Sequence, residues 1–427
     1  MSAFEIAAIL ISLSALFGYL NHNYLRLPHT IGQVFMALLA SLVIIIVDIS
    51  SSTISIASDL AEWMQKVDFY DTLMNGMLSF LLFAGAAKVD FLAFRKRLST
   101  ILIMAVAGTL ISAFLVALLM WGVLGLLGFH TPFIWCLVFG ALISPTDPVA
   151  VLSLFKTVKV PATLEAKITG ESLFNDGVGV VIFTAVMVIA TGGGLNENPI
   201  GIMEITSIFL VEAGGGALLG LTAGLLGFYA LRSIDEYNLE VLITLALVMG
   251  TYALAIRLQM SGPIAMVIAG LFLGNRSYEA LSEQSRDYMN KFWSLIDETL
   301  NSVLFLLIGL EILLIFEQAN HLGIALLAIP ICLFARWISV AISLSIQSHW
   351  VSFTPGAIPI LTWGGLRGGI AVALALSLPD DIHRPVILTA TYSVVLFSIL
   401  IQGLTVQPLV TKLIPTYHHL ETVMPSK

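Results

Sequence analysis

Long apolar stretches recur along the whole chain and are separated by short polar segments. Most hold about 20 residues, which is the length of a helix that crosses a hydrocarbon core about 30 Å thick. A transmembrane strand would instead alternate apolar and polar residues over about 10 residues, and the sequence has no series of such segments. The pattern predicts thirteen membrane-spanning helices, at residues 4–20, 29–48, 70–87, 98–128, 133–155, 162–190, 203–231, 239–256, 262–275, 291–316, 320–346, 356–378 and 385–413.

Composition agrees with this pattern, because 58% of the 427 residues are hydrophobic and only 11% are charged. A soluble domain carries about 25% charged residues, so these values indicate an all-α polytopic membrane protein. No polar segment is long enough for a soluble domain, and we predict one membrane domain over residues 1–427 with a short cytoplasmic tail at 414–427. The net charge of −8 says little about partners, and the basic run at 95–97 is interpreted as a topology signal rather than a nucleic-acid site.

The placement of Lys and Arg predicts the orientation in the membrane. In the thirteen-span arrangement, fourteen of the nineteen basic residues fall on one side, three fall on the other and two lie inside spans. Basic residues are enriched in cytoplasmic loops, so the C-terminus is expected in the cytoplasm and, with an odd number of spans, the N-terminus outside. Glu5 lies in the first span with no basic residue before it, which does not resemble a cleaved signal peptide.

Five ionisable residues lie in the middle of otherwise apolar spans. A charge at this depth costs at least about 2.5 kcal/mol, and such groups usually face a cavity or pair with one another. Any one of them could be merely structural, for example as a cap or by reaching an interface. Together they favour a buried functional site: Asp147 in "GALISPTDPVAVLSLFK", Glu171 and Asp176 in "GESLFNDGVGVV", Arg336, and Arg367 in "GGLRGGIAVALALSLP".

Two spans carry helix-breaking residues in the middle. Pro145 and Pro148 interrupt the fifth span, and four glycines surround Arg367 in the twelfth. Unwound backbone at membrane depth is tolerated only where protein covers it or where it lines a cavity, and a matched pair of interrupted spans indicates a transporter's midplane site. We therefore predict two six-helix repeats, at about 4–190 and 239–413, joined by a linker span at about 203–231. Seven spans separate the equivalent helices, so the repeats are inverted.

The motifs in these stretches resemble those of the monovalent cation/proton antiporters. "SPTDPVAV", "GESLFNDGVGVVIF", "LNSVLFLLIGLE", "ARWISV" and "GGLRGGIAVALAL" occur in the family's order and cover nearly the whole chain. They are most similar to the NhaP-type branch, which is related to animal sodium/proton exchangers. The resemblance implies a homodimer of thirteen-helix protomers in a bacterial inner membrane, with two crossing broken helices in each protomer. It also implies exchange of sodium, or of lithium or potassium, for protons, without a cofactor and without enzymatic chemistry.

The resemblance assigns roles to individual positions. The ion-binding aspartate falls on Asp176, and its neighbours around the transported metal ion fall on Asp147, Ser172 and Thr146. Asn175 matches a position that is a second aspartate in electrogenic relatives.

The resemblance also implies that Glu171 and Arg336 form a structural ion pair and that Arg367 is the arginine of the second broken helix. The chain departs from the family in its third span, where no acid precedes Asp90. An additional carboxylate ligand on that span is therefore not expected.

Elementary chemistry supports the same site. Ser172 and Asp176 are four residues apart, so they share one face of a helix and can offer oxygens to the same cation. Burial disfavours the charged form of a carboxylate and a bound cation favours it, so proton and cation compete for one group. Electrogenic relatives also carry a lysine in the span that corresponds to residues 291–316. Here Asn175 cannot titrate and that span has no lysine after Lys291, so the resemblance implies electroneutral one-for-one exchange.

Other classes remain open at this stage. A potassium/proton antiporter would use the same residues, a cation channel would need a continuous pore, and an intramembrane aspartyl protease could use two aspartates on adjacent spans. The protease would not explain the pair of Glu171 and Arg336 or the two broken spans. His349 or His383 could contribute to a pH response.

Overall fold

The computed structural model describes residues 3–50, 69–89, 94, 97–149, 151, 162–192, 210–312, 322–347 and 356–413. All regular elements within these residues are helices, so the predicted all-α class is confirmed. Nine helices in the described part of the chain are long and apolar enough to cross a membrane. Each described helix overlaps a predicted span, and the number of thirteen membrane crossings stays a prediction.

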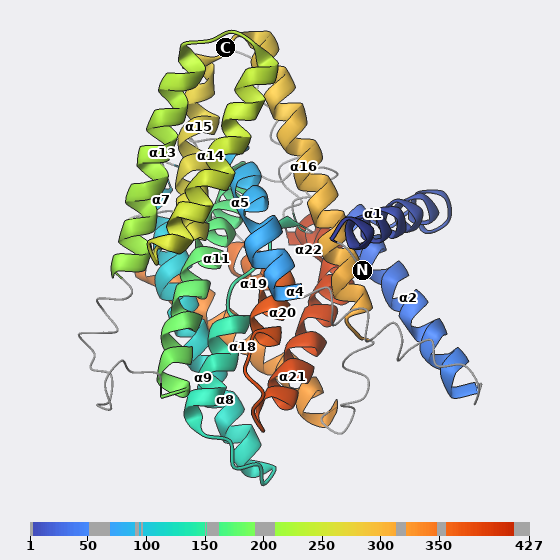
Figure 1. The fold of residues 1–427 in the computed structure, drawn as a ribbon. Helices are drawn as coiled ribbons and strands as arrows, with labels where there is room; N and C mark the ends of the chain where they lie inside the picture. The colour runs from blue at the N-terminus through green and yellow to red at the C-terminus, as the bar shows by residue number, and fades with distance from the viewer. Residues whose placement is uncertain are drawn as a thin grey trace.

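In one group of helices, α5, α13, α14, α15 and α16 lie together, while α1 and α2 project to one side from α16 (Figure 1). Within it α13 packs against α14 and α15, α15 packs against α5, and α16 packs against α2. A π-helical turn at Thr72–Met77 joins α4 to α5. The members of the group are α1 (Ala3–Leu20), α2 (His29–Ser50), α4 (Phe69–Asp71), α5 (Leu78–Ala87), α13 (Gly215–Arg232), α14 (Tyr237–Arg257), α15 (Gly262–Ala280) and α16 (Glu283–Leu310).

Glycines allow the helices of this group to approach closely. A Cβ atom on Gly216 would lie 2.5 Å from the Ser261 carbonyl oxygen, and one on Gly220 would lie 2.3 Å from that of Ala265. Residues four apart share a helix face, so α13 presents a small-residue stripe to α15. This is how membrane helices gain van der Waals contact when lipid is as apolar as their side chains.

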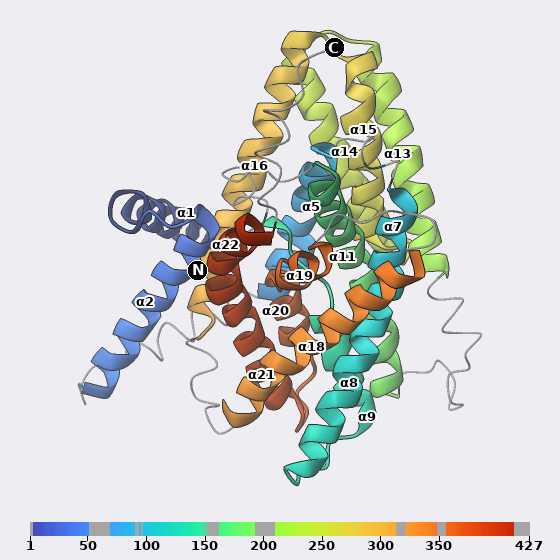
Figure 2. The same ribbon diagram turned by 180° about the vertical axis from the view of Figure 1, so that it is seen from behind.

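The second group, whose helices α8, α9, α18 and α21 are seen in Figure 2, contains the charged residues singled out above or adjoins them in the chain. Its helix α8 packs against α9 and α18, and α18 packs against α21. The members are α7 (Leu98–Ile103), α8 (Thr109–Leu126), α9 (Phe133–Ile143), α11 (Ala162–Ala190), α18 (Leu322–Gln347), α19 (Ala357–Trp363), α20 (Gly369–Leu376), α21 (Arg384–Phe397) and α22 (Gly403–Leu413).

Helix α16 begins well before the predicted start of the tenth span at residue 291. Its first residue is Glu283, and the Ser282 side chain caps it by accepting a hydrogen bond of 3.3 Å from the Ser285 backbone amide. A hydropathy pattern detects the bilayer-crossing part of a helix, whereas the helix itself extends as far as its caps and side chains permit. For the same reason α15 continues to Ala280 beyond the predicted end at residue 275.

Both predicted interruptions are present. Helix α9 ends at Ile143 and residues 144–148 are not helical, while residues 364–368 separate α19 from α20. The two interruptions lie against each other, because the Asp147 amide donates a hydrogen bond of 2.8 Å to the Leu366 carbonyl in an isolated antiparallel bridge. This contact brings two parts of the chain more than 200 residues apart into one site. The inverted relation of the two repeats stays a prediction.

Candidate functional site

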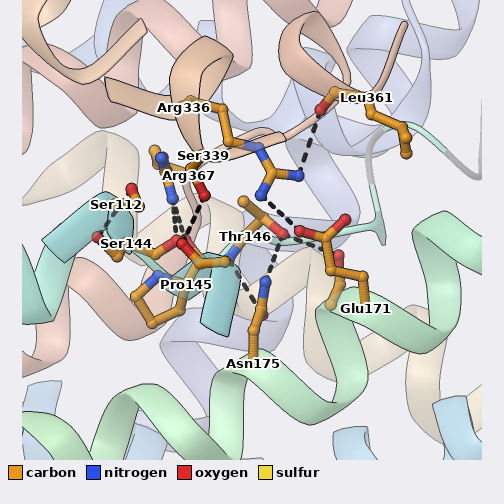
Figure 3. Close-up of polar contacts among 12 residues, drawn as sticks. Ser112, Ser144, Pro145, Thr146, Glu171, Asn175, Arg336, Ser339, Leu361 and Arg367 are labelled. Atoms are coloured by element: carbon orange, nitrogen blue, oxygen red, sulfur yellow. Dashed lines mark hydrogen bonds and ion pairs between the residues drawn. The ribbon is translucent and has the colours of Figure 1, made fainter. Parts of the chain in front are cut away.

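Arg367 connects the two interruptions (Figure 3). Its guanidinium Nη1 donates to the carbonyl oxygens of Ser144 and Pro145, the latter at 2.9 Å. These carbonyls follow the last turn of α9, where the helix leaves acceptors without partners and carries the negative end of its dipole. The positively charged Arg367 guanidinium therefore pairs with backbone carbonyls that the end of α9 leaves without helical hydrogen bonds.

A series of hydrogen bonds through two side chains holds the backbone at Arg367 in place. The Arg367 amide donates to Ser398 Oγ at 3.2 Å, and Ser398 in turn donates to Gln402 Oε1 at 2.5 Å. Gln402 Nε2 then donates to the Trp363 carbonyl at 3.0 Å, at the end of α19. Ser398 and Gln402 belong to a π-helical turn between α21 and α22 (Ser398–Gln402), a feature that frequently marks functional sites.

Helix α11 holds the first interruption through Asn175. The Asn175 amide accepts a hydrogen bond of 3.2 Å from the Thr146 backbone and donates one of 2.9 Å to Thr146 Oγ1. Ser172, one turn earlier on α11, places its Oγ 3.0 Å from the same Thr146 hydroxyl. The structure thus brings Thr146, Ser172 and Asn175 together, and both ends of the Asn175 amide are engaged by Thr146.

Asp147 lies between the two interruptions. One carboxylate oxygen accepts a hydrogen bond of 2.8 Å from the amide of Val149, the residue directly after Pro148. A Cβ atom on Gly368 would lie 2.3 Å from the other oxygen, so only a glycine fits opposite this carboxylate. The absent side chain at Gly368 therefore determines where the Asp147 carboxylate can sit.

Asp176 lies on α11 with 8% of its surface exposed. Its carboxylate makes no hydrogen bond with the described residues, but it interacts electrostatically with Asp147. Directly after Asp176, helix α11 packs closely against two neighbours, since Cβ atoms on Gly177 and Gly179 would lie 2.7 Å from Ile264 and 2.1 Å from Pro145. The carboxylate is thus held in place by the helix that carries it rather than by a side-chain partner.

Glu171 and Arg336 meet in the interior. Arg336 Nη1 lies 2.5 Å from Glu171 Oε1, and the two side chains are 5% and 2% exposed. Arg336 Nη2 donates to the Leu361 carbonyl on α19 at 3.3 Å, and Gly365 leaves room for the guanidinium at the second interruption. The pair joins α11, α18 and α19, so it fixes the helix that bears Asp176 relative to the second interruption.

Asp297 also acts on the site, and the sequence pattern did not single it out. It accepts a hydrogen bond of 2.8 Å from Asn301, pairs with Lys88 at 2.6 Å, and acts electrostatically on Asp147. Its position in "DETLNS", within the predicted tenth span, could have identified it. Hydropathy averaged over an apolar window did not reveal that α16 has a polar face there.

The other residues singled out in the sequence are Asp90, His349 and His383. Asp90 and His349 fall outside the described residues. The His383 ring packs on Trp135 at a centroid distance of 5.6 Å, and its backbone amide donates to Asp381.

The site therefore concentrates oxygen atoms of several kinds. Carboxylates come from Asp147 and Asp176, and hydroxyls come from Thr146 and Ser172. Hard cations prefer oxygen ligands of this kind, and a carboxylate without a fixed partner can also take a proton. Such a set can bind either ion, one at a time.

Comparison with known proteins gives consistent matches. A family model described as sodium/hydrogen exchanger, transmembrane, matches residues 11–412. The Na(+)/H(+) antiporter NhaP of Pseudomonas aeruginosa is 42% identical over 415 residues, which cover 96% of each chain. The Na(+)/H(+) antiporter NhaH of Halobacillus dabanensis is 34% identical over 393 residues, which cover 91% of this chain and 93% of that protein.

The fold also has a solved counterpart. The structure of the sodium proton antiporter MjNhaP1 from Methanocaldococcus jannaschii superposes with a TM-score of 0.76 and covers 96% of this chain and 98% of that one. The two sequences are 19% identical, so this likeness concerns the fold alone.

Proposed function

Because the chain belongs to the sodium/hydrogen exchanger family, we propose that it exchanges a monovalent cation, with sodium as the preferred ion, for protons across a membrane. The names of its relatives support sodium, and the oxygen-rich site is compatible with it. The transported ion and the proton are the substrates. The protein acts as a homodimer in the bacterial inner membrane and needs no cofactor.

The observation that carries this proposal is the Asp176 carboxylate. It is buried, it makes no hydrogen bond with the described residues, and oxygens of Thr146 and Ser172 belong to the same region of α11 and the first interruption. A lone buried carboxylate is costly unless a proton or a cation compensates its charge. Each ion displaces the other, so the site returns across the membrane only when one of them is bound.

The surrounding residues have separate tasks in this mechanism. Asp147, Thr146 and Ser172 complete the ion's ligand set together with Asp176. Asn175 holds the first interruption open, since its amide occupies both the backbone and the hydroxyl of Thr146.

Two arginines keep the scaffold in place. Arg367 satisfies the free carbonyls at the end of α9, and Arg336 braces α11 through Glu171. Neither arginine needs to change partner when the site exchanges a proton for a cation.

Exchange in proteoliposomes tests the proposal. We expect sodium added on one side to drive protons to the other in the wild-type protein, with lithium and potassium assayed in parallel. Asp176→Asn should abolish this exchange, whereas Asp235→Asn, on the exposed connection between α13 and α14, should not. Ion flux without a counter-ion gradient would identify a channel, and a response to potassium alone would identify a potassium/proton antiporter.

A further inference from the structure

An ion pair between Lys88 and Asp297 lies at the end of α5, apart from the pair that braces α11. Lys88 Nζ lies 2.6 Å from Asp297 Oδ2, and the two side chains are 42% and 20% exposed. Asn301, one turn further along α16, donates a hydrogen bond of 2.8 Å to the other carboxylate oxygen of Asp297. One oxygen of this carboxylate is therefore held by a neutral amide, and the other binds a positively charged group.

Close packing fixes the two helices that carry this pair. A Cβ atom on Gly274 would lie 2.2 Å from the Ala87 carbonyl oxygen, so α15 lies directly against the last residue of α5. Trp293, one turn before Asp297 on the same face of α16, packs its ring on that of Phe83 in α5 at a centroid distance of 4.7 Å. The backbones of the pair are thus held in place, whereas the four-carbon stem of a lysine is flexible.

Asp297 belongs to a series of three carboxylates that act on one another. Asp297 acts electrostatically on Asp147, and Asp147 acts on Asp176. The series runs from the exposed Lys88, which pairs with Asp297, to the buried Asp176. Charges of one sign along an approach raise the local concentration of the opposite ion, so this series favours the arrival of a cation.

We propose that Asp297 is a first contact for the monovalent cation on its way to Asp176, and that Lys88 competes with the cation for this contact. The ammonium group and the transported ion both carry one positive charge, so the carboxylate oxygen can hold either of them. Exposed ion pairs contribute little to stability, so a cation from solution can displace the lysine. This inference rests on the proposed function, and it makes Lys88 a residue that sets the apparent affinity for the ion rather than the maximal rate of exchange.

Exchange kinetics in proteoliposomes test this competition, with choline chloride keeping the ionic strength constant. Lys88→Met should lower the half-saturating sodium concentration about threefold, as expected when the cation no longer has to displace an exposed partner, and should leave the maximal rate unchanged. Lys88→Arg should not lower that concentration, because a guanidinium binds a carboxylate at least as well as an ammonium group does. Asp297→Asn should raise it, because the first contact is then lost.

The matched control is Lys291→Met. Lys291 pairs with Asp287 at the same distance of 2.6 Å, and both lie on the helix that carries Asp297. This variant also removes one positive charge and one exposed ion pair, but it should leave the half-saturating concentration unchanged. An equal fall in the two variants would show only a general effect of surface charge and would overturn the proposal.

A double variant separates competition from simple repulsion of the cation. If Lys88 acts by occupying Asp297, Lys88→Met should have no further effect in a protein that already carries Asp297→Asn. A full fall of the half-saturating concentration in that background would mean that the lysine only repels the cation, and it would overturn the proposal.

Melting curves of the purified protein in detergent follow binding without transport. The sodium concentration that gives half of the rise in melting temperature should be lower for Lys88→Met than for the wild type and for Lys291→Met. Wild-type exchange with equal half-saturating concentrations in these proteins would overturn the role of Lys88 and leave the proposed function standing. Absence of exchange in the wild type would overturn the proposed function, and equal melting curves would then overturn the role of Lys88 as well.

Discussion

Helix α11 carries two buried carboxylates five residues apart, and they have opposite surroundings. Glu171 is paired with Arg336 at 2.5 Å, and its partner is in turn bonded to the backbone of α19. Asp176 makes no hydrogen bond with the described residues and has another carboxylate, Asp147, as its electrostatic neighbour. Both residues carry a carboxylate on the same helix. The protein supplies a positive partner for the Glu171 carboxylate and none among the described residues for the Asp176 carboxylate.

This difference separates structure from transport. A buried charge that has a permanent partner contributes to the fold, and removing the partner is costly. A buried carboxylate without one must be compensated from outside, by a proton or by a cation. Glu171 is therefore expected to affect stability and Asp176 to affect exchange.

The largest effect is expected at Asp176. Asp176→Asn removes the group that we propose both ions share, so cation-dependent proton movement in proteoliposomes should fall to the level of empty liposomes. The melting temperature should stay close to that of the wild type, because no hydrogen bond to a described residue is lost. Exchange that survives in this variant, measured beside Asp235→Asn, would mean that Asp147 or another group is the shared site.

The ion pair should show the reverse behaviour. Glu171→Gln or Arg336→Gln leaves one buried charge without its partner, and each should destabilise the protein by about 3–5 kcal/mol. Asp287→Asn is the matched control, because Asp287 pairs with Lys291 at 2.6 Å on an exposed face of α16 and such exposed pairs contribute little to stability.

A double-mutant cycle sharpens this prediction. The combined Glu171→Gln and Arg336→Gln variant should lose less stability than the sum of the single variants, because neither charge is then left alone. Strictly additive shifts in unfolding free energy would mean that the two residues do not act as a unit.

A smaller effect is expected from a single methyl group at the second interruption. Gly368→Ala places a Cβ atom against the Asp147 carboxylate, 2.3 Å from one oxygen in the native arrangement, so the carboxylate must move. We expect the half-saturating sodium concentration to rise about tenfold, which corresponds to roughly 1.4 kcal/mol. Gly250→Ala on α14 has no atom within 4 Å of the new Cβ and should leave exchange unchanged.

The sequence was a good guide to the elements and a partial guide to the site. Hydropathy located the helices, and proline and glycine located both interruptions, because these signals are local. The contact between Asp147 and Leu366 could not be read from the chain, since it joins segments more than 200 residues apart. The partners of Arg367 were missed for a related reason: they are the backbone carbonyls of Ser144 and Pro145, and no residue type in the sequence identifies an acceptor of that kind.

The smallest expected effect is that of membrane voltage on exchange. Asn175 cannot titrate, and its amide is engaged by Thr146, so Asp176 is the one carboxylate assigned to both ions. Asp147 is the main alternative carrier of a second proton, and it accepts a hydrogen bond of 2.8 Å from the Val149 amide. With Asp176 as the one carrier, we expect one proton to exchange for one monovalent cation and no net charge to move. Liposomes clamped with valinomycin and potassium, or with another clamp if potassium is transported, should give the same exchange rate and end point at every imposed potential. A shift of the end point with voltage would require a second proton and would assign it to Asp147.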